Sequence, residues 1–122
     1  MIQSGLDDSD IRLKVVFFRT ERGSEPVREW LKTLSSDDKR VIGEDIKTVQ
    51  FGWPLGMPVV RKMEPGLWEV RSRLVGRIAR VLFTVIDGKM VLLHGFIKKN
   101  NKTPHDDLIL ARRRLAQLRG EK

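Results

Sequence analysis

Hydrophobic positions in the first half of the chain form two helical stripes behind a short strand. The β-branched and aromatic run at residues 12–19 is typical of a strand. The first helical stripe, behind Pro26, is formed by Val27, Trp30, Leu31 and Leu34. The second stripe, behind a cap at Ser35 or Ser36, is formed by Ile42, Ile46 and Val49. These periods predict one strand followed by two helices.

Beyond residue 66 the pattern changes to the alternation that is typical of strands. Three strands are predicted, at residues 67–74, 78–85 and 90–98. The dipeptide Asp87-Gly88 indicates a hairpin between the last two of them. Thr103 as N-cap and Pro104 as the first helical residue then predict a last helix.

The resulting order, β-α-α-β-β-β-α, is that of a small α+β domain, an antiparallel sheet with helices packed on one face. We expect this single domain to span residues 11–122, with residues 1–10 as a flexible lead-in. Because the helices would cover one face only, the residues on the opposite, open face should determine what the protein binds.

Composition excludes several classes of protein. The 122 residues include no cysteine, which rules out a disulfide scaffold and a cysteine-ligated zinc site. No apolar run approaches the ~20 residues of a membrane span, and the polar, acidic N-terminus is unlike a secretory signal. The sequence has neither a Gly-rich phosphate loop nor a metal-binding motif. We therefore expect a cytoplasmic protein that uses no membrane, metal or cofactor.

Charge is distributed unevenly along the chain. The formal net charge is +8. Residues 1–60 hold 9 basic and 10 acidic side chains, whereas residues 61–122 hold 15 basic and 6 acidic ones. The excess of positive charge therefore lies in the second half, which favours a polyanionic partner, nucleic acid above all.

Three arginines gather on the face of the sheet that is expected to be open. Arg71 and Arg73 lie on one predicted strand, and Arg80 lies on the next. Like charges on neighbouring strands repel each other, so this cluster indicates a site for an anion. Glu69 shares the face and is either a proton carrier or the ion-pair partner of Arg71.

The contribution of the third strand depends on the register of the hairpin. A three-residue loop pairs Val85 with Lys89 and sets His94 beside Arg80. A two-residue loop shifts the pairing by one and sends His94 to the core face. We favour the first register because it does not bury a histidine. It also puts two further residues on the open face, Phe96 and Lys98.

Such a face would suit single-stranded RNA, because cations hold phosphates and an aromatic ring stacks on bases. The candidate catalytic residues are Arg71, Arg73, Arg80, Lys98, Glu69 and His94. The candidate RNA-binding residues are Lys62, Phe96, Lys99 and Lys102. His94 is either a proton carrier or a structural histidine.

Several segments resemble the RelE/ParE superfamily of bacterial toxins, and within it the HigB-like, phage-associated branch. They are PVREWLKTL (26–34), GLWEVR (66–71), RIARVLFTVIDGK (77–89) and VLLHGFIKKNNKTP (91–104). The resemblance implies the toxin of a type II toxin–antitoxin system. Such a toxin cleaves mRNA on the ribosome without metal, by attack of the ribose 2′-OH on the adjacent phosphate. The implied partner is a helix-turn-helix antitoxin encoded in the same operon.

By position, the resemblance implies that Arg71, Arg73 and Arg80 bind the scissile phosphate, and that Lys98 and Lys99 form the basic end of the last strand. Many relatives use a tyrosine or histidine near the C-terminus, but this chain has no tyrosine. Two alternatives remain open. One is a ParE-like toxin that binds gyrase, and the other is a catalytically degenerate, phage-derived homologue that binds RNA or its antitoxin.

Overall fold

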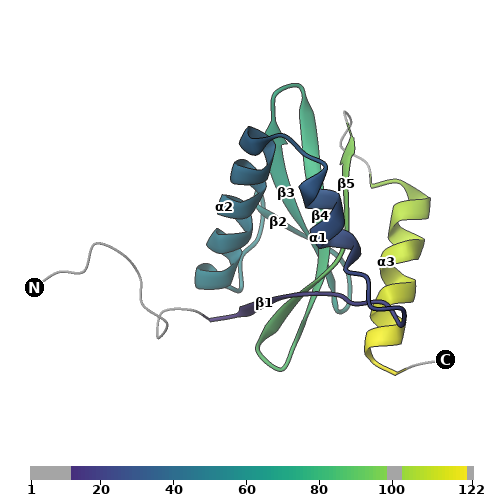
Figure 1. The fold of residues 1–122 in the computed structure, drawn as a ribbon. Helices are drawn as coiled ribbons and strands as arrows, with labels where there is room; N and C mark the ends of the chain where they lie inside the picture. Colours follow the sequence, from purple (N-terminus) through teal and green to yellow (C-terminus); the bar gives the residue numbers. More distant parts are fainter. Residues whose placement is uncertain (1–11, 99–102, 121–122) are drawn as a thin grey trace, which may run out of the picture.

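The described part of the chain, residues 12–98 and 103–120 of the computed structural model, forms a five-stranded sheet with helices on both sides (Figure 1). In chain order the elements are β1 (Lys14–Phe17), α1 (Pro26–Lys32), α2 (Ser36–Gly52), β2 (Val60–Glu64), β3 (Leu67–Leu74), β4 (Arg77–Ile86), β5 (Lys89–Lys98) and α3 (His105–Leu118). The α+β class and the three helices are confirmed. The expected lead-in, Lys99 and Lys102 lie outside the described residues. None of the described helices is long and apolar enough to cross a membrane.

One face of the sheet is covered by α1 and α2, as the two helical stripes predict. The buried side chains of these helices are Val27, Ile42, Ile46 and Val49. They join a core cluster with side chains of β3 and β4, among them Val70, Val81 and Phe83. Ser35 caps α2, because its hydroxyl accepts a hydrogen bond from the backbone N–H of Asp38 at 3.2 Å.

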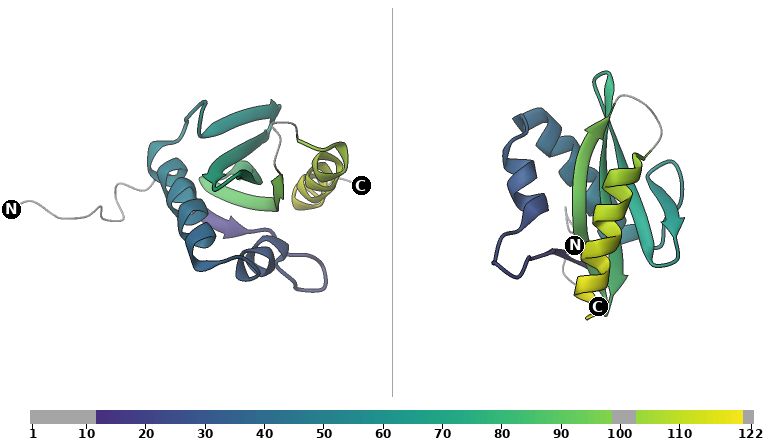
Figure 2. Two further views of the ribbon diagram at one scale, coloured as in Figure 1. Left: turned by 90° about the horizontal axis from the view of Figure 1, so that it is seen from above. Right: turned by 90° about the vertical axis from the view of Figure 1, so that its right-hand side faces the viewer.

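The last helix covers the opposite face of the sheet, so the expectation that all helices lie on one face is wrong (Figure 2). Ala111 and Leu115 of α3 belong to a second apolar cluster. Its members on the sheet include Leu67, Leu82, Leu93 and Phe96. The physical reason lies in β4 and β5, which carry apolar side chains on both faces and therefore need cover on both.

The sheet is mixed rather than antiparallel, and it has one strand more than the sequence predicts. The strand order is β1-β5-β4-β3-β2. β1 pairs in parallel with β5, whereas the other neighbours are antiparallel. The additional strand, β2, lies at the edge beside β3, and its sequence VRKME lacks a regular alternation of apolar and polar residues.

The β4–β5 hairpin turns through two residues, so the favoured three-residue loop is wrong. Asp87 and Gly88 have φ values of 50° and 73°, and a type I′ turn requires such positive values at both central positions. Ile86 consequently pairs with Lys89.

A β-bulge in β5 returns His94 to the face that was predicted for it. Phe83 pairs with Leu92, but Leu82 pairs with His94, so that Leu93 is one extra residue in β5. Because a shift of one residue exchanges the faces of a strand, the bulge cancels the effect of the shorter loop. His94 therefore lies on the α3 face of the sheet, but it pairs with Leu82, and Phe96 takes the position beside Arg80 that was predicted for His94.

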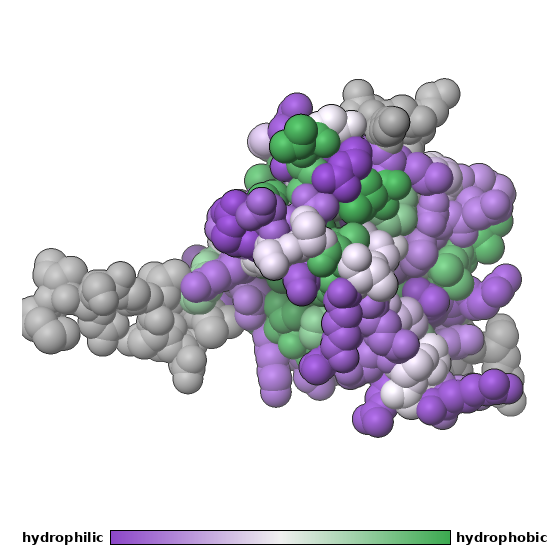
Figure 3. Space-filling model, turned by 45° about the horizontal axis from the view of Figure 1, so that its top comes forward, coloured by the Kyte–Doolittle hydropathy of each residue, from purple (hydrophilic) through white to green (hydrophobic). Residues whose placement is uncertain are grey.

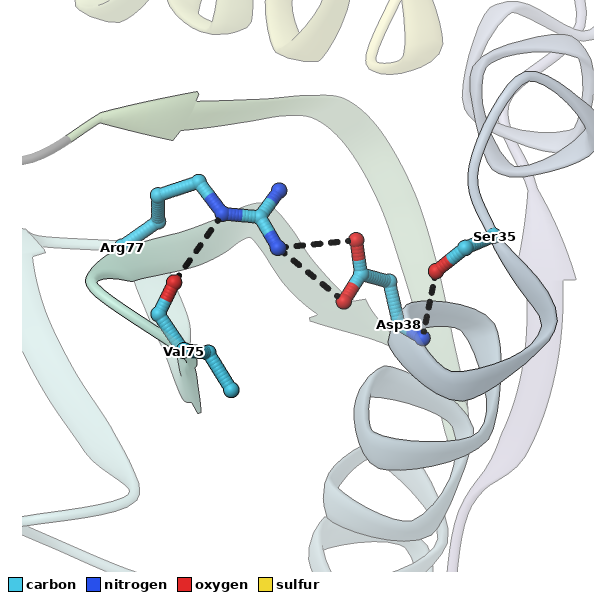
Figure 4. A network of polar contacts seen from close by, with 4 residues as sticks. All are labelled: Ser35, Asp38, Val75 and Arg77. Carbon is cyan, nitrogen blue, oxygen red and sulfur yellow. Dashed lines mark hydrogen bonds and ion pairs between the residues drawn. The ribbon is translucent and has the colours of Figure 1, made fainter.

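The β3–β4 hairpin is tied to the first turn of α2 (Figure 4). Nη2 of Arg77 lies 3.2 Å and 3.1 Å from the two carboxylate oxygens of Asp38, and Nε of Arg77 donates to the carbonyl of Val75 at 3.3 Å. The dipole of α2 also favours a negative charge at Asp38. These contacts hold the hairpin end of the sheet next to α2.

Candidate functional site

Four of the basic residues predicted from the sequence lie in two rows across the sheet, at the end that carries the β3–β4 hairpin. Directly paired residues of antiparallel strands share a face. The first row consists of Arg73, Ile78 and Lys98. The second row consists of Arg71, Arg80 and Phe96. The structure therefore brings four of the predicted cations together on the α3 face.

A buried polar network joins the second row to Thr103, two residues before α3 begins. Oε1 of Glu69 accepts a hydrogen bond from Nη1 of Arg71 at 3.2 Å. Oε2 of Glu69 accepts a hydrogen bond from the hydroxyl of Thr103 at 2.6 Å. The Thr103 oxygen in turn accepts from Nη1 of Arg80 at 3.3 Å. The interpretation of Glu69 as the ion-pair partner of Arg71 is confirmed.

Burial lowers the pKa of the Arg80 guanidinium below its ordinary value. The negative charge of Glu69 opposes this shift, whereas the positive charges of Arg71 and Arg61 add to it. A guanidinium stays protonated in proteins, so Arg80 needs a countercharge in its buried position. Glu69 supplies that countercharge, and we interpret the pair as a support that positions Arg71.

α3 covers part of the face that was expected to be open. Arg80 is 0% and Phe96 is 8% exposed, and the guanidinium carbon of Arg80 lies 6.0 Å from the centre of the Phe96 ring. Neither side chain is accessible to a ligand in this arrangement, so the expectation of an open face is wrong at these two positions. Burial of the apolar neighbours Leu82 and Leu93 beneath α3 is the physical reason.

His94 fastens α3 to β5 in the described structure. Its Nε2 lies 2.6 Å from Oδ1 of Asp107 in the first turn of α3. The imidazole stacks on Phe96 with ring centres 5.5 Å apart, and its Nδ1 lies 3.5 Å from Nη1 of Arg114. These contacts favour the structural alternative for His94.

A cavity of about 610 Å³ opens near the β3–β4 hairpin, between α2 and the loop that leads into β2. Its charged lining residues are Arg61, Arg71, Arg73 and Asp45, and we call this site the cationic groove. Arg61 was missed by the sequence reasoning because β2 was not recognised. Arg61 pairs with Glu69 across β2 and β3, which puts it on the same face as Arg71.

Two further predicted cations, Lys98 and Lys62, do not line the groove. Lys98 is exposed at the end of the first row. Lys62 pairs with Trp68, so its side chain is directed to the opposite face from that of Arg61. Figure 3 brings this end of the molecule forward and shows hydrophobic side chains next to strongly hydrophilic ones.

A domain with this order of elements is compatible with a RelE-like fold. Residues 29–116, more than half of the chain, match the family described as Phage derived protein Gp49-like (DUF891). The chain therefore belongs to the Gp49-like family of phage-derived proteins, which is part of the RelE/ParE-like toxin superfamily. A search of curated proteins found no match.

Proposed function

We propose that this protein is the toxin of a type II toxin–antitoxin system, an endoribonuclease of the HigB-like branch. Its substrate would be mRNA on the ribosome, bound in the cationic groove. The observation that carries the proposal is that Arg61, Arg71 and Arg73 line one cavity. Within the described residues, Arg61 and Arg73 form no ion pair with a carboxylate, so their charges are available to phosphate groups.

The chemistry that fits this groove is attack of a ribose 2′-OH on the adjacent phosphate. The 2′ oxygen forms a bond to phosphorus while the bond to the 5′ oxygen breaks. The 2′-OH loses a proton and the departing 5′ oxygen gains one. Negative charge grows on the phosphate oxygens in the transition state, and guanidinium groups stabilise it through paired hydrogen bonds.

The two residues that the sequence suggests as proton carriers, Glu69 and His94, are badly placed for proton transfer. Glu69 is fully buried, and His94 is bonded to Asp107. Neither lines the cationic groove. We therefore assign the arginines the stabilisation of charge, and we treat Glu69 and His94 as residues that support the sheet and α3.

The proposed partner is a helix-turn-helix antitoxin encoded in the same operon. An acidic segment of such a protein would be attracted to the cationic groove and would compete with the phosphates of RNA. This partner, like the mRNA substrate, belongs in the cytoplasm.

The proposal is tested by mapping transcript ends after the protein is induced in a bacterial host. We expect growth arrest and new transcript ends within coding regions. Arg73→Ala removes an exposed cation of the groove, and we expect it to lower the yield of these ends by at least about tenfold. Lys32→Ala removes an exposed cation of α1 on the opposite face and should leave cleavage unchanged.

Three outcomes would contradict the proposal. Unchanged transcripts with altered plasmid supercoiling would indicate the ParE-like alternative. Full growth arrest by a folded Arg73→Ala protein would show that the groove is not the site. Binding of RNA without any new ends would indicate the catalytically degenerate alternative.

A further inference from the structure

The cationic groove contains one carboxylate, and the positive charges beside it do not neutralise it through direct contacts. Asp45 of α2 is half-buried and lines the same cavity as Arg61, Arg71 and Arg73. In the parts of the chain that the structure describes, the carboxylate of Asp45 forms no ion pair and no hydrogen bond with another side chain. A carboxylate only accepts hydrogen bonds, so it remains available to a ligand with N–H donors.

The rest of the groove is apolar. Its uncharged lining residues include Val41, Met57, Val59 and Ile78. Met57 is 64% exposed, so its side chain offers apolar surface to a ligand in the groove. The cavity volume of about 610 Å³ falls within the range of about 300–1,000 Å³ that is typical of small-molecule sites. A flat ring with polar edges suits such walls.

We propose that the cationic groove binds a guanine base of the RNA strand and thereby gives the protein its sequence preference. This inference rests on the proposed function and assigns Asp45 the role of a specificity-determining residue. The Watson–Crick edge of guanine presents two neighbouring donors, N1–H and the 2-amino group, which a carboxylate accepts together. The guanine O6 is an acceptor and is complementary to a guanidinium of the same groove.

The other bases match these residues less well. Adenine and cytosine each place an acceptor nitrogen next to their amino group, and that nitrogen would face the carboxylate without a proton. Uracil offers one N–H between two carbonyl oxygens. Each therefore leaves a polar group unpaired in the groove, which is the usual basis of discrimination at a partly buried site.

The inference is tested by binding of short RNA strands to the full chain. We would use fluorescein-labelled 2′-O-methyl pentanucleotides of uridine with G, A, C or U at the central position, since they lack the 2′-OH that cleavage needs. Fluorescence anisotropy should give a dissociation constant for the G strand that is lower than that for the U strand by about tenfold or more.

Asp45→Asn is the decisive variant. Loss of a negative charge strengthens binding of every polyanion, so the ratio of the G and U constants is the quantity to compare. We expect this ratio to fall to within about twofold of one, because an amide offers a single acceptor oxygen. Glu44→Gln is the matched control, an exposed carboxylate of the same helix that is bonded to Arg40 outside the groove, and it should keep the preference for G.

The outcomes separate this inference from the proposed function. If the wild-type protein binds all four strands equally, or if Asp45→Asn keeps the preference for G, the guanine site is wrong while RNA binding stands. If the wild-type protein binds none of the strands, the guanine site is wrong, whereas the proposed function is decided separately by the mapping of transcript ends. Thermal unfolding of each variant verifies that the protein is folded in the assay.

Discussion

Gly95 provides the space in which α1 packs against the sheet. A Cβ atom at this position of β5 would overlap the six-membered ring of Trp30. Trp30 thus lies directly on the backbone of β5, and its neighbours in this core cluster include Leu31 and Leu92. The helical stripe predicts that Trp30 is directed into the core, and a glycine in a strand indicates that another group approaches its backbone closely. Neither pattern predicts that Trp30 is the group that contacts Gly95.

We expect Gly95→Ala to lower the free energy of unfolding by about 1–3 kcal/mol, because a rigid indole must move to admit the methyl group. Urea denaturation measures the change. The control is Gly43→Ala on the exposed side of α2, where a Cβ meets nothing within 4 Å. That substitution should raise stability by about 0.5–1 kcal/mol through helix propensity. A Gly95→Ala protein as stable as the wild type would contradict the packing of Trp30.

Thr103 binds two buried side chains of the sheet instead of capping α3. Its position before Pro104 predicts an N-cap, yet α3 begins at His105 with Pro104 as its N-cap residue and with no capping hydrogen bond from a side chain. The Thr103 hydroxyl instead bonds to Glu69 and Arg80. A buried carboxylate has a stronger demand for a donor than a helix end near solvent. The sequence contains both partners but not the fold that brings them together.

At the scale of elements, α3 is held on the sheet by polar contacts as well as by its apolar stripe. Thr103 bonds to Glu69 at 2.6 Å, and Asp107 bonds to His94 at 2.6 Å. Nη1 of Arg114 donates to the carbonyl of Leu93 at 2.8 Å. This bond supplies a donor to the backbone carbonyl of the extra residue in the β5 bulge. Glu69 and His94 were expected on an open face of the sheet, which is why the sequence does not place α3.

Thr103→Val removes the hydroxyl and leaves the buried Glu69 carboxylate without one of its donors. We expect the free energy of unfolding to fall by about 1–3 kcal/mol. Amide hydrogen exchange should become faster in the first turns of α3 relative to those of α2. Thr103→Ser keeps the hydroxyl and should retain most of the protection. Equal exchange in all three proteins would show that the contact does not hold α3.

Elements with a strong hydrophobic period are those that the sequence predicts well. α1, α2, β3 and β4 all lie where the stripes and the alternation indicate. β2 was missed because it depends on pairing with β3, and the parallel pairing of β1 depends on a strand far away in the chain. Pairings of this kind are decided by tertiary contacts rather than by local preference.

At the scale of the whole molecule, the fold brings part of the excess positive charge together in the cationic groove. The second half carries 15 of the 24 basic residues, and three of these line the cationic groove. Charge alone predicts a polyanionic partner but not which cations act together. The structure shows which cations lie together. Arg80 is buried and Lys62 is directed to the other face of the sheet, whereas Arg61 lines the cationic groove.

If RNA binds in the cationic groove as proposed, the number of phosphates that the groove neutralises can be measured through the dependence of binding on salt. For single strands the logarithm of the binding constant falls with the logarithm of salt concentration by about 0.7 for each phosphate contact. Arg61→Ala and Arg73→Ala should each reduce this slope by about that amount, because their side chains are exposed in the groove. Lys32→Ala, on α1, serves as the control for the loss of one positive charge. If the control reduces the slope as much as the groove variants do, the protein attracts RNA by its overall charge and not through a defined site.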